Sequence, residues 1–280
     1  MRLRKKNRLG TIILTYAIIL LSVIFFIFPI FWILYCSFRT QASIFTGELI
    51  APLEDLTLEN YITIFSVTDF PLYFWNSLRI STVVSICSLI LASIGAYGLS
   101  RYKIRGKNIL IMGIFSTQML PQVLLIIPLF LIIFSLKLLD TTMGVVFLQL
   151  ILVLPFSVWM LKGYFDGIPQ DIENSARIDG CNTFQTLIYI VFPMVAPGIL
   201  VAGFFSFIVS WGDYLIVSII NQTQRTATLT LVIQRLSSAL LIRWGQVAAA
   251  IVLIIVPTII FFTIVQKRLV EGLTAGGIKQ

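Results

Sequence analysis

The chain contains no histidine, and its three cysteines lie far apart. Without histidine, no imidazole can ligate a metal or haem or act as a general base. Cys36, Cys87 and Cys181 form no C-x-x-C pair, so the sequence indicates neither a disulfide framework nor a zinc site. We therefore expect no metal site in this chain.

A phosphate-binding loop is also missing. The pair Gly106-Lys107 is followed by Asn108 and lacks the upstream glycine of the G-x-x-x-x-G-K-[ST] motif. We therefore expect that the chain is not an enzyme, does not hydrolyse ATP and holds no cofactor of its own. A net charge of +8 could indicate a nucleic-acid-binding protein. In so apolar a chain, however, basic residues are typical of the loops that anchor membrane helices, so we expect no nucleic-acid partner.

Charged residues are scarce, at 11% of the chain, whereas hydrophobic residues make up 58%. Soluble globular proteins carry about 25% charged residues. A soluble fold of this composition would expose large apolar areas, and a disordered chain would be poor in apolar residues. The apolar runs are continuous rather than alternating, which argues against a barrel. The sequence thus predicts an all-α polytopic membrane protein that contacts lipid.

Six uncharged runs are each long enough to cross a bilayer, which takes about 20 helical residues. The run that begins at Gly180 is too long for one helix, so we place its first part outside the bilayer, before Pro197. The first run has no A-x-A cleavage site after it and is interpreted as an uncleaved span. The expected spans of this single transmembrane domain, residues 1–280, are 9–38, 80–100, 108–136, 141–161, 197–220 and 244–266.

The distribution of Lys and Arg predicts the orientation of these spans. Fourteen of the 20 basic residues lie in the N-terminus, the 101–107 and 162–196 loops and the tail, 267–280. Cytoplasmic loops carry the excess of Lys and Arg, so both termini are expected in the cytoplasm. The 39–75 loop, which contains five acidic residues, is then extracytoplasmic.

The cytoplasmic 163–196 loop has the pattern of two short helices. Pro169 suits a first helical turn, Asp179-Gly180 suits a helix end, and Asn182 can cap the next helix. Phe184, Leu187, Ile188 and Val191 share one apolar face, which is expected to anchor the hairpin on the transmembrane bundle, and Pro193 is expected to end the second helix. The pattern alone leaves two interpretations open: a hairpin that stiffens the loop, or an element that docks on a cytoplasmic partner.

The string IPQDIENSARIDG at 168–180, followed by Phe192-Pro193 and Pro197, resembles the EAA loop of ABC-importer permeases. In that family, the loop carries a coupling helix that binds a groove of the ATPase subunit. Here Asn174 stands where the family has Glu, Ser175 replaces the first Ala, and Glu173 lies one position earlier. The resemblance implies that the ATPase-coupling residues are Glu173, Asn174, Ser175, Ala176, Asp179 and Gly180. It implies that the loop scaffold is formed by Pro169, Phe184, Leu187, Pro193 and Pro197.

Further segments resemble carbohydrate-importer permeases, among them Leu154-Pro155-Phe156, Leu139-Asp140-Thr141 and Trp211-Gly212-Asp213-Tyr214. The tail from Gly272 to Lys279 is similar to that of the second permease subunit of maltose-type transporters, where it reaches between the ATPase subunits. This resemblance implies a sugar importer of the bacterial inner membrane. Its expected partners are a homologous permease forming a heterodimer, two ATPase subunits that bind ATP and Mg, and an extracytoplasmic binding protein.

Two other functions remain open at this point. A permease of another ABC importer, for a glycerol phosphate, a polyamine or a peptide, would share the EAA-type loop but not the tail. A secondary carrier would transport without an ATPase partner.

Asp213 is the acidic residue expected deepest in the membrane, about two-thirds through the fifth span. An Asp at a helix centre costs about 2.5–3.5 kcal/mol on insertion scales, so it should face the bundle or a water-filled path. One hypothesis places it on the translocation path, with candidate residues Trp211, Asp213, Tyr214, Gln118 and Gln122. The other pairs Asp213 inside the bundle with a polar side chain, such as Gln118, Gln122 or Gln149.

Overall fold

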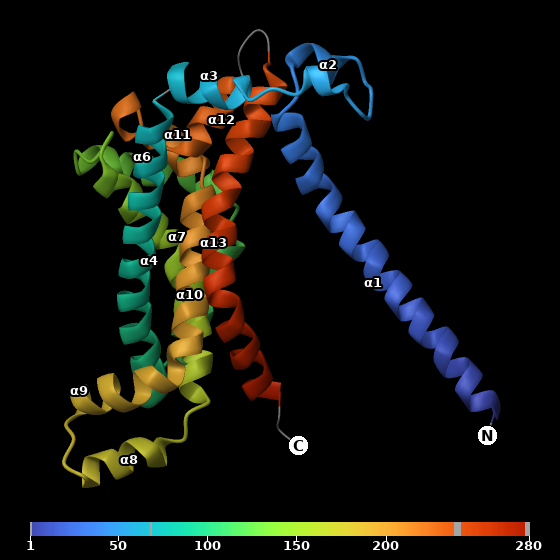
Figure 1. Cartoon of the computed structure of the whole chain (residues 1–280). Coiled ribbons are helices and arrows are strands. Elements are labelled where there is room, and N and C mark those ends of the chain that lie inside the picture. The colour runs from blue at the N-terminus through green and yellow to red at the C-terminus, as the bar shows by residue number, and fades with distance from the viewer. Residues whose placement is uncertain (1, 68, 238–241, 278–280) are drawn as a thin grey trace. The chain divides into compact units, whose positions relative to one another are not determined.

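The computed structural model describes residues 2–67, 69–237 and 242–277 (Figure 1). These residues form helices joined by short loops, and the described part of the chain contains no strand beyond the isolated bridge between Arg39 and Leu56. Five helices are long and apolar enough to cross a membrane, or six if one bent pair counts as a span. The predicted all-α polytopic fold is confirmed.

The chain divides into two compact units, of which the first comprises Met1–Asp69 and Ile233–Val256. It contains α1 (Arg2–Ser37), α2 (Gln41–Phe45), the short turn η1 (Leu53–Asp55), α3 (Glu59–Val67) and the first part of α13 (Trp244–Gly277). The buried Arg39 guanidinium orders the loop after α1 by donating to Ser43 Oγ at 3.0 Å and to the Glu48 carbonyl at 2.9 Å.

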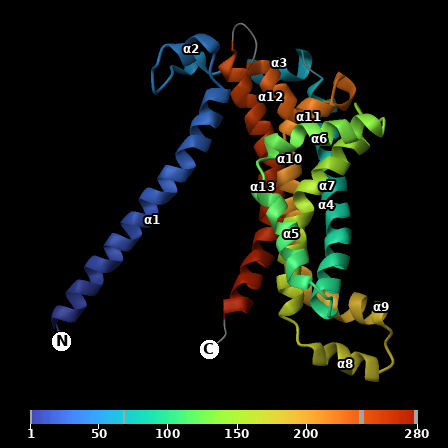
Figure 2. The same ribbon diagram turned by 180° about the vertical axis from the view of Figure 1, so that it is seen from behind.

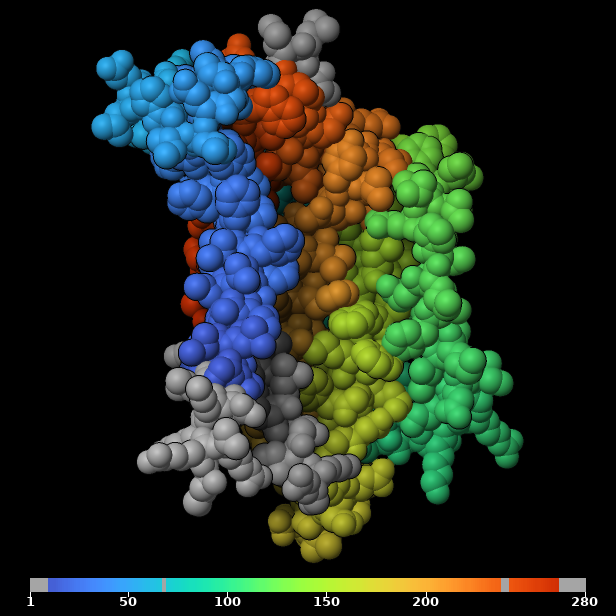
Figure 3. All heavy atoms as spheres, turned by 90° about the vertical axis from the view of Figure 1, so that its right-hand side faces the viewer, coloured from blue at the N-terminus to red at the C-terminus, as the bar shows by residue number. Residues whose placement is uncertain are grey.

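The second unit, Phe70–Val232 with Pro257–Gln280, is built around three packed helices. These are α4 (Phe70–Arg101), α7 (Thr142–Asp166) and α10 (Phe192–Gly212), which run side by side (Figures 1 and 2). The helix α5 (Lys107–Met119), green in Figure 3, lies beside the yellow-green α7, and α6 (Gln122–Ser135) follows α5 across a sharp bend. The remaining elements are α8 (Gln170–Ile178), α9 (Thr183–Thr186) and η2 (Leu187–Val191) at one end, and α11 (Leu215–Ile220), η3 (Gln224–Thr226) and α12 (Leu229–Ser237), whose last residues belong to the first unit.

The expected span at 108–136 is not one straight helix. The axes of α5 and α6 meet at 101° across Leu120 and Pro121. Proline has no backbone N–H and pushes the preceding residue toward extended backbone, and Leu120 has a ψ of 129°. Pro121 therefore breaks the span, whereas Pro128 lies inside α6.

The fifth span also differs from the expected 197–220 in both bounds. The prediction that Pro193 ends a helix is wrong, because α9 (Thr183–Thr186), the π-helical turn η2 (Leu187–Val191) and α10 are consecutive and form one helical stretch, Thr183–Gly212. Pro193 lies well inside this stretch, directly after the π-helical turn, and membrane helices tolerate proline where a local π-helical adjustment re-satisfies the freed backbone groups. The stretch ends at Gly212, so Asp213 follows the helix with a ψ of 124° instead of lying inside it.

Four helices extend beyond the expected spans: α1 begins at Arg2 rather than at residue 9, and α7 ends at Asp166 rather than at residue 161. The helix α4 begins at Phe70 rather than near residue 80, and α13 continues past residue 266 to Gly277. The end of the tail that resembles maltose-type permeases, including Lys279, lies outside the described residues. The role of the tail stays a prediction.

Candidate functional site

The α8–α9 hairpin extends past one end of the α4–α7–α10 bundle (Figures 1 and 2). The helix α8 (Gln170–Ile178) ends at Gly180, whose φ of +88° is a left-handed conformation that glycine adopts without strain. Asn182 and Gln185 then form a capping box, in which each side chain accepts a 2.9 Å hydrogen bond from the backbone N–H of the other residue. The turn predicted at Asp179-Gly180 and the cap predicted at Asn182 are both present.

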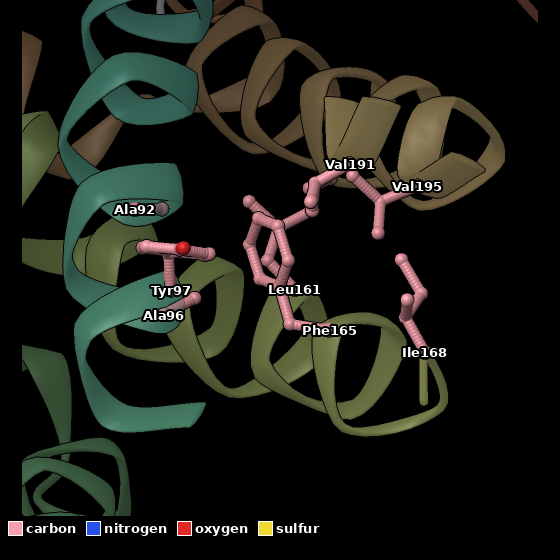
Figure 4. Close-up of a cluster of buried hydrophobic side chains, with 9 residues drawn as sticks. Ala92, Ala96, Tyr97, Leu161, Phe165, Ile168, Val191 and Val195 are labelled. Atoms are coloured by element: carbon pink, nitrogen blue, oxygen red, sulfur yellow. The ribbon is translucent and has the colours of Figure 1, made fainter. Parts of the chain in front are cut away.

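A buried apolar cluster packs this hairpin against the bundle (Figure 4). Leu187 and Ile172, on η2 and α8, are partly buried against it, so both arms of the hairpin contact the same core. The cluster includes residues of α4, α7, η2 and α10 and one residue of the link between α7 and α8. Its members are Ala92, Ala96, Tyr97, Leu161, Phe165, Ile168, Val191, Val195 and Ala202.

Two of the expected ATPase-coupling residues, Glu173 and Ala176, face this chain rather than solvent, with 3% of each residue exposed. The Arg101 guanidinium donates from Nε to Glu173 Oε1 at 2.5 Å, and the Tyr97 hydroxyl donates to Oε2 at 2.9 Å. The sequence interpretation missed Tyr97 and treated Arg101 only as a loop charge. The sequence does carry a signal for this pair, because Tyr97 and Arg101 are four residues apart at the end of one helix and therefore share a face.

The outer face of the hairpin carries the other four coupling candidates, Asn174, Ser175, Asp179 and Gly180, which are all exposed. Ile178 is 86% exposed and Phe184 is 71% exposed. The prediction that Phe184 packs on the bundle with Leu187 and Val191 is wrong. Because a π-helical turn holds more residues than an α-helical turn, η2 rotates Phe184 out of line with Val191.

The second candidate site surrounds Asp213 in the break between α10 and α11. Gln149 on α7 donates to Asp213 Oδ2 at 3.0 Å, and Gln122 at the start of α6 approaches Oδ1 at 3.5 Å. The Thr230 hydroxyl donates to the Asp213 carbonyl at 2.9 Å. Asp213 is thus paired with glutamines inside the bundle, as the second of the two hypotheses expected.

Gln149 also joins Asp213 to a set of buried serines. The Ser210 hydroxyl donates to Gln149 Oε1 at 2.6 Å and lies 3.2 Å from Ser81 Oγ. Nearer the other end of the bundle, Ser206 lies 3.1 Å from Ser157 and 3.0 Å from Ser88. The sequence analysis missed these serines, although two of them, Ser81 and Ser88, share one face of α4 with the buried Ser85, which donates to the Gly203 carbonyl at 2.8 Å.

The other path candidates do not converge on Asp213. Trp211 is 4% exposed and packs between Phe74 and Phe207, with ring centroids 5.8 and 5.5 Å away. The exposed Gln118 donates to the Leu152 carbonyl at 2.9 Å, and Tyr214 is exposed. Of the five, the structure brings together only Asp213 and Gln122.

Comparisons with known proteins agree with this architecture. The model of the binding-protein-dependent transport system inner membrane component family matches residues 88–274. The inner membrane ABC transporter permease protein YcjP of Escherichia coli K12 is 35% identical over 92% of this chain and 93% of its own length. The trehalose/maltose transport system permease protein MalG of Thermococcus litoralis is 31% identical over 98% of this chain and 99% of its own.

A solved structure has the same fold. It is a chain of a bacterial ABC transporter involved in the import of the acidic polysaccharide alginate, with a TM-score of 0.77 and 24% identity, covering 91% of this chain and 95% of that one. The family match spans the hairpin and the Asp213 site together. This chain is therefore a multi-pass membrane permease that belongs to the family of binding-protein-dependent transport system inner membrane components.

Proposed function

We propose that this chain is a permease subunit of an ABC importer that moves a sugar or oligosaccharide across a bacterial cell membrane. The names of the similar proteins support a carbohydrate cargo, because one names trehalose and maltose and another names alginate. The segments that resemble carbohydrate importers, such as Leu139-Asp140-Thr141 and Trp211-Gly212-Asp213-Tyr214, support the same class.

The exposed outer face of the α8–α9 hairpin carries this proposal. Ile178 and Phe184 present large apolar side chains at the tip of a helical hairpin that the Gly180 turn and the Asn182 cap hold in place. An exposed apolar surface rimmed by polar residues is typical of a protein interface. In the proposed importer this face binds the ATPase subunit, together with the exposed Asn174 and Asp179.

The proposed importer needs other subunits for the steps that this chain cannot perform. With no phosphate-binding loop, it relies on two ATPase subunits that bind ATP and Mg. A homologous permease completes the membrane path as a heterodimer, and an extracytoplasmic binding protein delivers the sugar. Both termini and the α8–α9 hairpin lie on the cytoplasmic side in this proposal, in accord with the excess of Lys and Arg there.

The hairpin would transmit movement of the ATPase subunits to the membrane helices. ATP binding closes the ATPase pair and shifts the hairpin, which turns the spans toward an outward-open state. The binding protein then releases the sugar, and hydrolysis resets the inward-facing state. Such a change is a rigid-body rotation of subunits about their interface, which here is the contact between the hairpin and the ATPase subunit.

The test compares two substitutions at positions of equal exposure. Ile178 on the hairpin and Ile50 in the loop after α2 are each 86% exposed. Ile178→Asp should reduce co-purification of the ATPase subunit by more than about tenfold, as expected at the centre of an interface. Ile50→Asp should leave it unchanged. Full ATPase capture by Ile178→Asp, or sugar uptake by the chain without any ATPase, would overturn the proposal.

A further inference from the structure

Glu173 ties α8 to the end of α4 by both of its carboxylate oxygens. Oε1 accepts from Arg101 Nε at 2.5 Å, and Oε2 accepts from the Tyr97 hydroxyl at 2.9 Å. The side chains of Arg101 and Glu173 are 9% and 4% exposed. Hydrogen bonds between ionised groups that are shielded from water are stronger than neutral ones and fix geometry more tightly.

Arg101 also contacts the segment before α8 directly and the end of α7 through Ser100. Its second terminal nitrogen donates to the Ile168 carbonyl at 3.2 Å, just before α8, and its first donates to Ser100 Oγ at 3.0 Å. The Ser100 hydroxyl in turn donates to Asp166 at the end of α7 at 2.5 Å, and Asp166 pairs with Lys162. One guanidinium thus joins α4, α7 and α8.

From this geometry we infer that Glu173, Arg101 and Tyr97 form a clamp that makes α8 move together with α4 when a partner displaces the hairpin. This inference rests on the proposed function. In it, Glu173 is a positioning residue that acts through this chain's own Arg101, and the ATPase is contacted by the exposed residues on the other side of α8.

Apolar packing alone would not hold α8 in this way. Of the α8 residues, only the partly buried Ile172 packs against the buried apolar cluster, whereas η2 and α10 contribute three of its members, Val191, Val195 and Ala202. Apolar contact is non-directional, so α8 could slide on the core with little change in buried area. A buried ion pair gains little net stability because its charges must be desolvated, but it specifies one relative position of the two helices.

The first experiment tests the clamp without reference to transport. Amide hydrogen exchange of residues 170–178 is measured on the full chain in lipid nanodiscs. Glu173→Gln and Arg101→Gln should each speed exchange by about tenfold, because α8 then opens locally more often. Asp171→Asn removes the same charge from an exposed side chain of the same helix and should leave exchange unchanged. Unchanged exchange in both clamp variants would overturn the clamp.

The second experiment measures coupling in the importer assembled with its ATPase subunits and binding protein. Glu173→Gln should retain the ATPase subunits but lower the amount of sugar taken up per ATP hydrolysed, by about fivefold or more if the pair fixes α8 as inferred. The reversed pair, Glu173→Arg with Arg101→Glu, should restore much of this ratio, and Glu54→Gln in the exposed η1 turn should not alter it.

The outcomes separate this inference from the proposed function. Loss of ATPase capture by Glu173→Gln would mean that Glu173 contacts the ATPase directly, which overturns the inference but not the importer. A normal ratio of uptake to hydrolysis in both single variants would also overturn it. If the unaltered chain captures no ATPase, the proposed function fails, while the exchange experiment still decides whether the clamp exists.

Discussion

The Gln149 side-chain nitrogen lies 3.0 Å from Asp213 Oδ2, while the oxygen of the same amide accepts a 2.6 Å hydrogen bond from Ser210. Gln149 is fully buried, and its amide has a single orientation because its nitrogen must donate to Asp213 and its oxygen must accept from Ser210. One side chain of α7 therefore sets the position of the acidic residue at the end of α10. Asp213 has a partner from the bundle that donates a hydrogen bond to its carboxylate.

Replacing Gln149 by Leu keeps the volume of the side chain but removes both hydrogen bonds. The Asp213 carboxylate and the Ser210 hydroxyl then each lose their shortest hydrogen bond inside the bundle, so we expect a loss of about 1–3 kcal/mol in the free energy of unfolding. Thermal unfolding of the purified chain in detergent measures this loss. Gln118→Leu, at an exposed glutamine, is the control and should change stability little. Equal unfolding temperatures for the two variants would contradict the assigned role.

Gly180→Val tests the turn between α8 and α9. A Cβ at this glycine would meet no atom within 4 Å, so the cost comes from its φ of +88° alone. A left-handed conformation costs a residue with a side chain about 1–2 kcal/mol, and more for a β-branched one. We expect the valine variant to reach the membrane but to bind the ATPase subunit less well, by co-purification. Gly180→Asn should bind nearly normally, since Asn tolerates this conformation; equal loss in both would exclude φ as the cause.

Gly198→Ala tests the close approach of α10 to α7. A Cβ at Gly198 would lie 2.4 Å from Cγ of the Tyr164 ring, which is closer than real contacts allow. Overpacking of this kind costs about 1–3 kcal/mol and should lower the unfolding temperature. Gly95→Ala is the control, because its Cβ would lie an ordinary 3.7 Å from Val158. Combining Gly198→Ala with Tyr164→Leu should recover part of the loss, and failure to do so would point to another contact.

Asp140 makes one loop sensitive to acid. Burial raises the pKa of this carboxyl, but hydrogen bonds from the Thr226 and Thr223 hydroxyls and from the backbone N–H groups of Thr223 and Gln222 outweigh it and lower the pKa. A carboxyl with a lowered pKa in the folded state stabilises the fold above its unfolded pKa, and this contribution is lost as pH falls through the folded pKa.

We therefore expect residues 221–226 to be protected from amide exchange at pH 7 and to lose protection below about pH 4, near the unfolded pKa of Asp. Asp140→Asn should show the loss already at pH 7. The control is Glu54→Gln, which removes an exposed carboxyl elsewhere and should leave residues 221–226 protected at pH 7. Protection that does not depend on pH in the unaltered chain would rule out this role for Asp140.

Membrane orientation can be tested with single cysteines in a chain whose three natural cysteines are replaced by serine. Ile50→Cys and Lys103→Cys both lie at exposed positions. With the excess of Lys and Arg in the cytoplasm, Ile50→Cys should react with an impermeant thiol reagent from outside intact cells, and Lys103→Cys should react only after lysis. The reverse pattern would invert the orientation.

Several features of this protein could be predicted from short stretches of sequence. Continuous apolar runs predict membrane helices because a bilayer offers no partner for an unpaired backbone group. The turn at Gly180 and the cap at Asn182 follow from the conformations of single residues and their near neighbours. Pro121 and Pro193 show the limit of such reasoning, since Pro121 breaks a span whereas Pro193 lies inside a continuous helical stretch, depending on how neighbouring turns pack.

The partners of the key polar groups were decided only by the tertiary structure. Glu173 pairs with Arg101 across 72 residues of sequence, and Gln149 pairs with Asp213 across 64. Helical periodicity groups residues into faces but does not say which face turns inward, so Glu173 was expected on the outside and Phe184 on the inside. Those orientations depend on how α4, α7 and η2 pack together, because burying a charge is favourable only where a distant residue supplies its counter-charge.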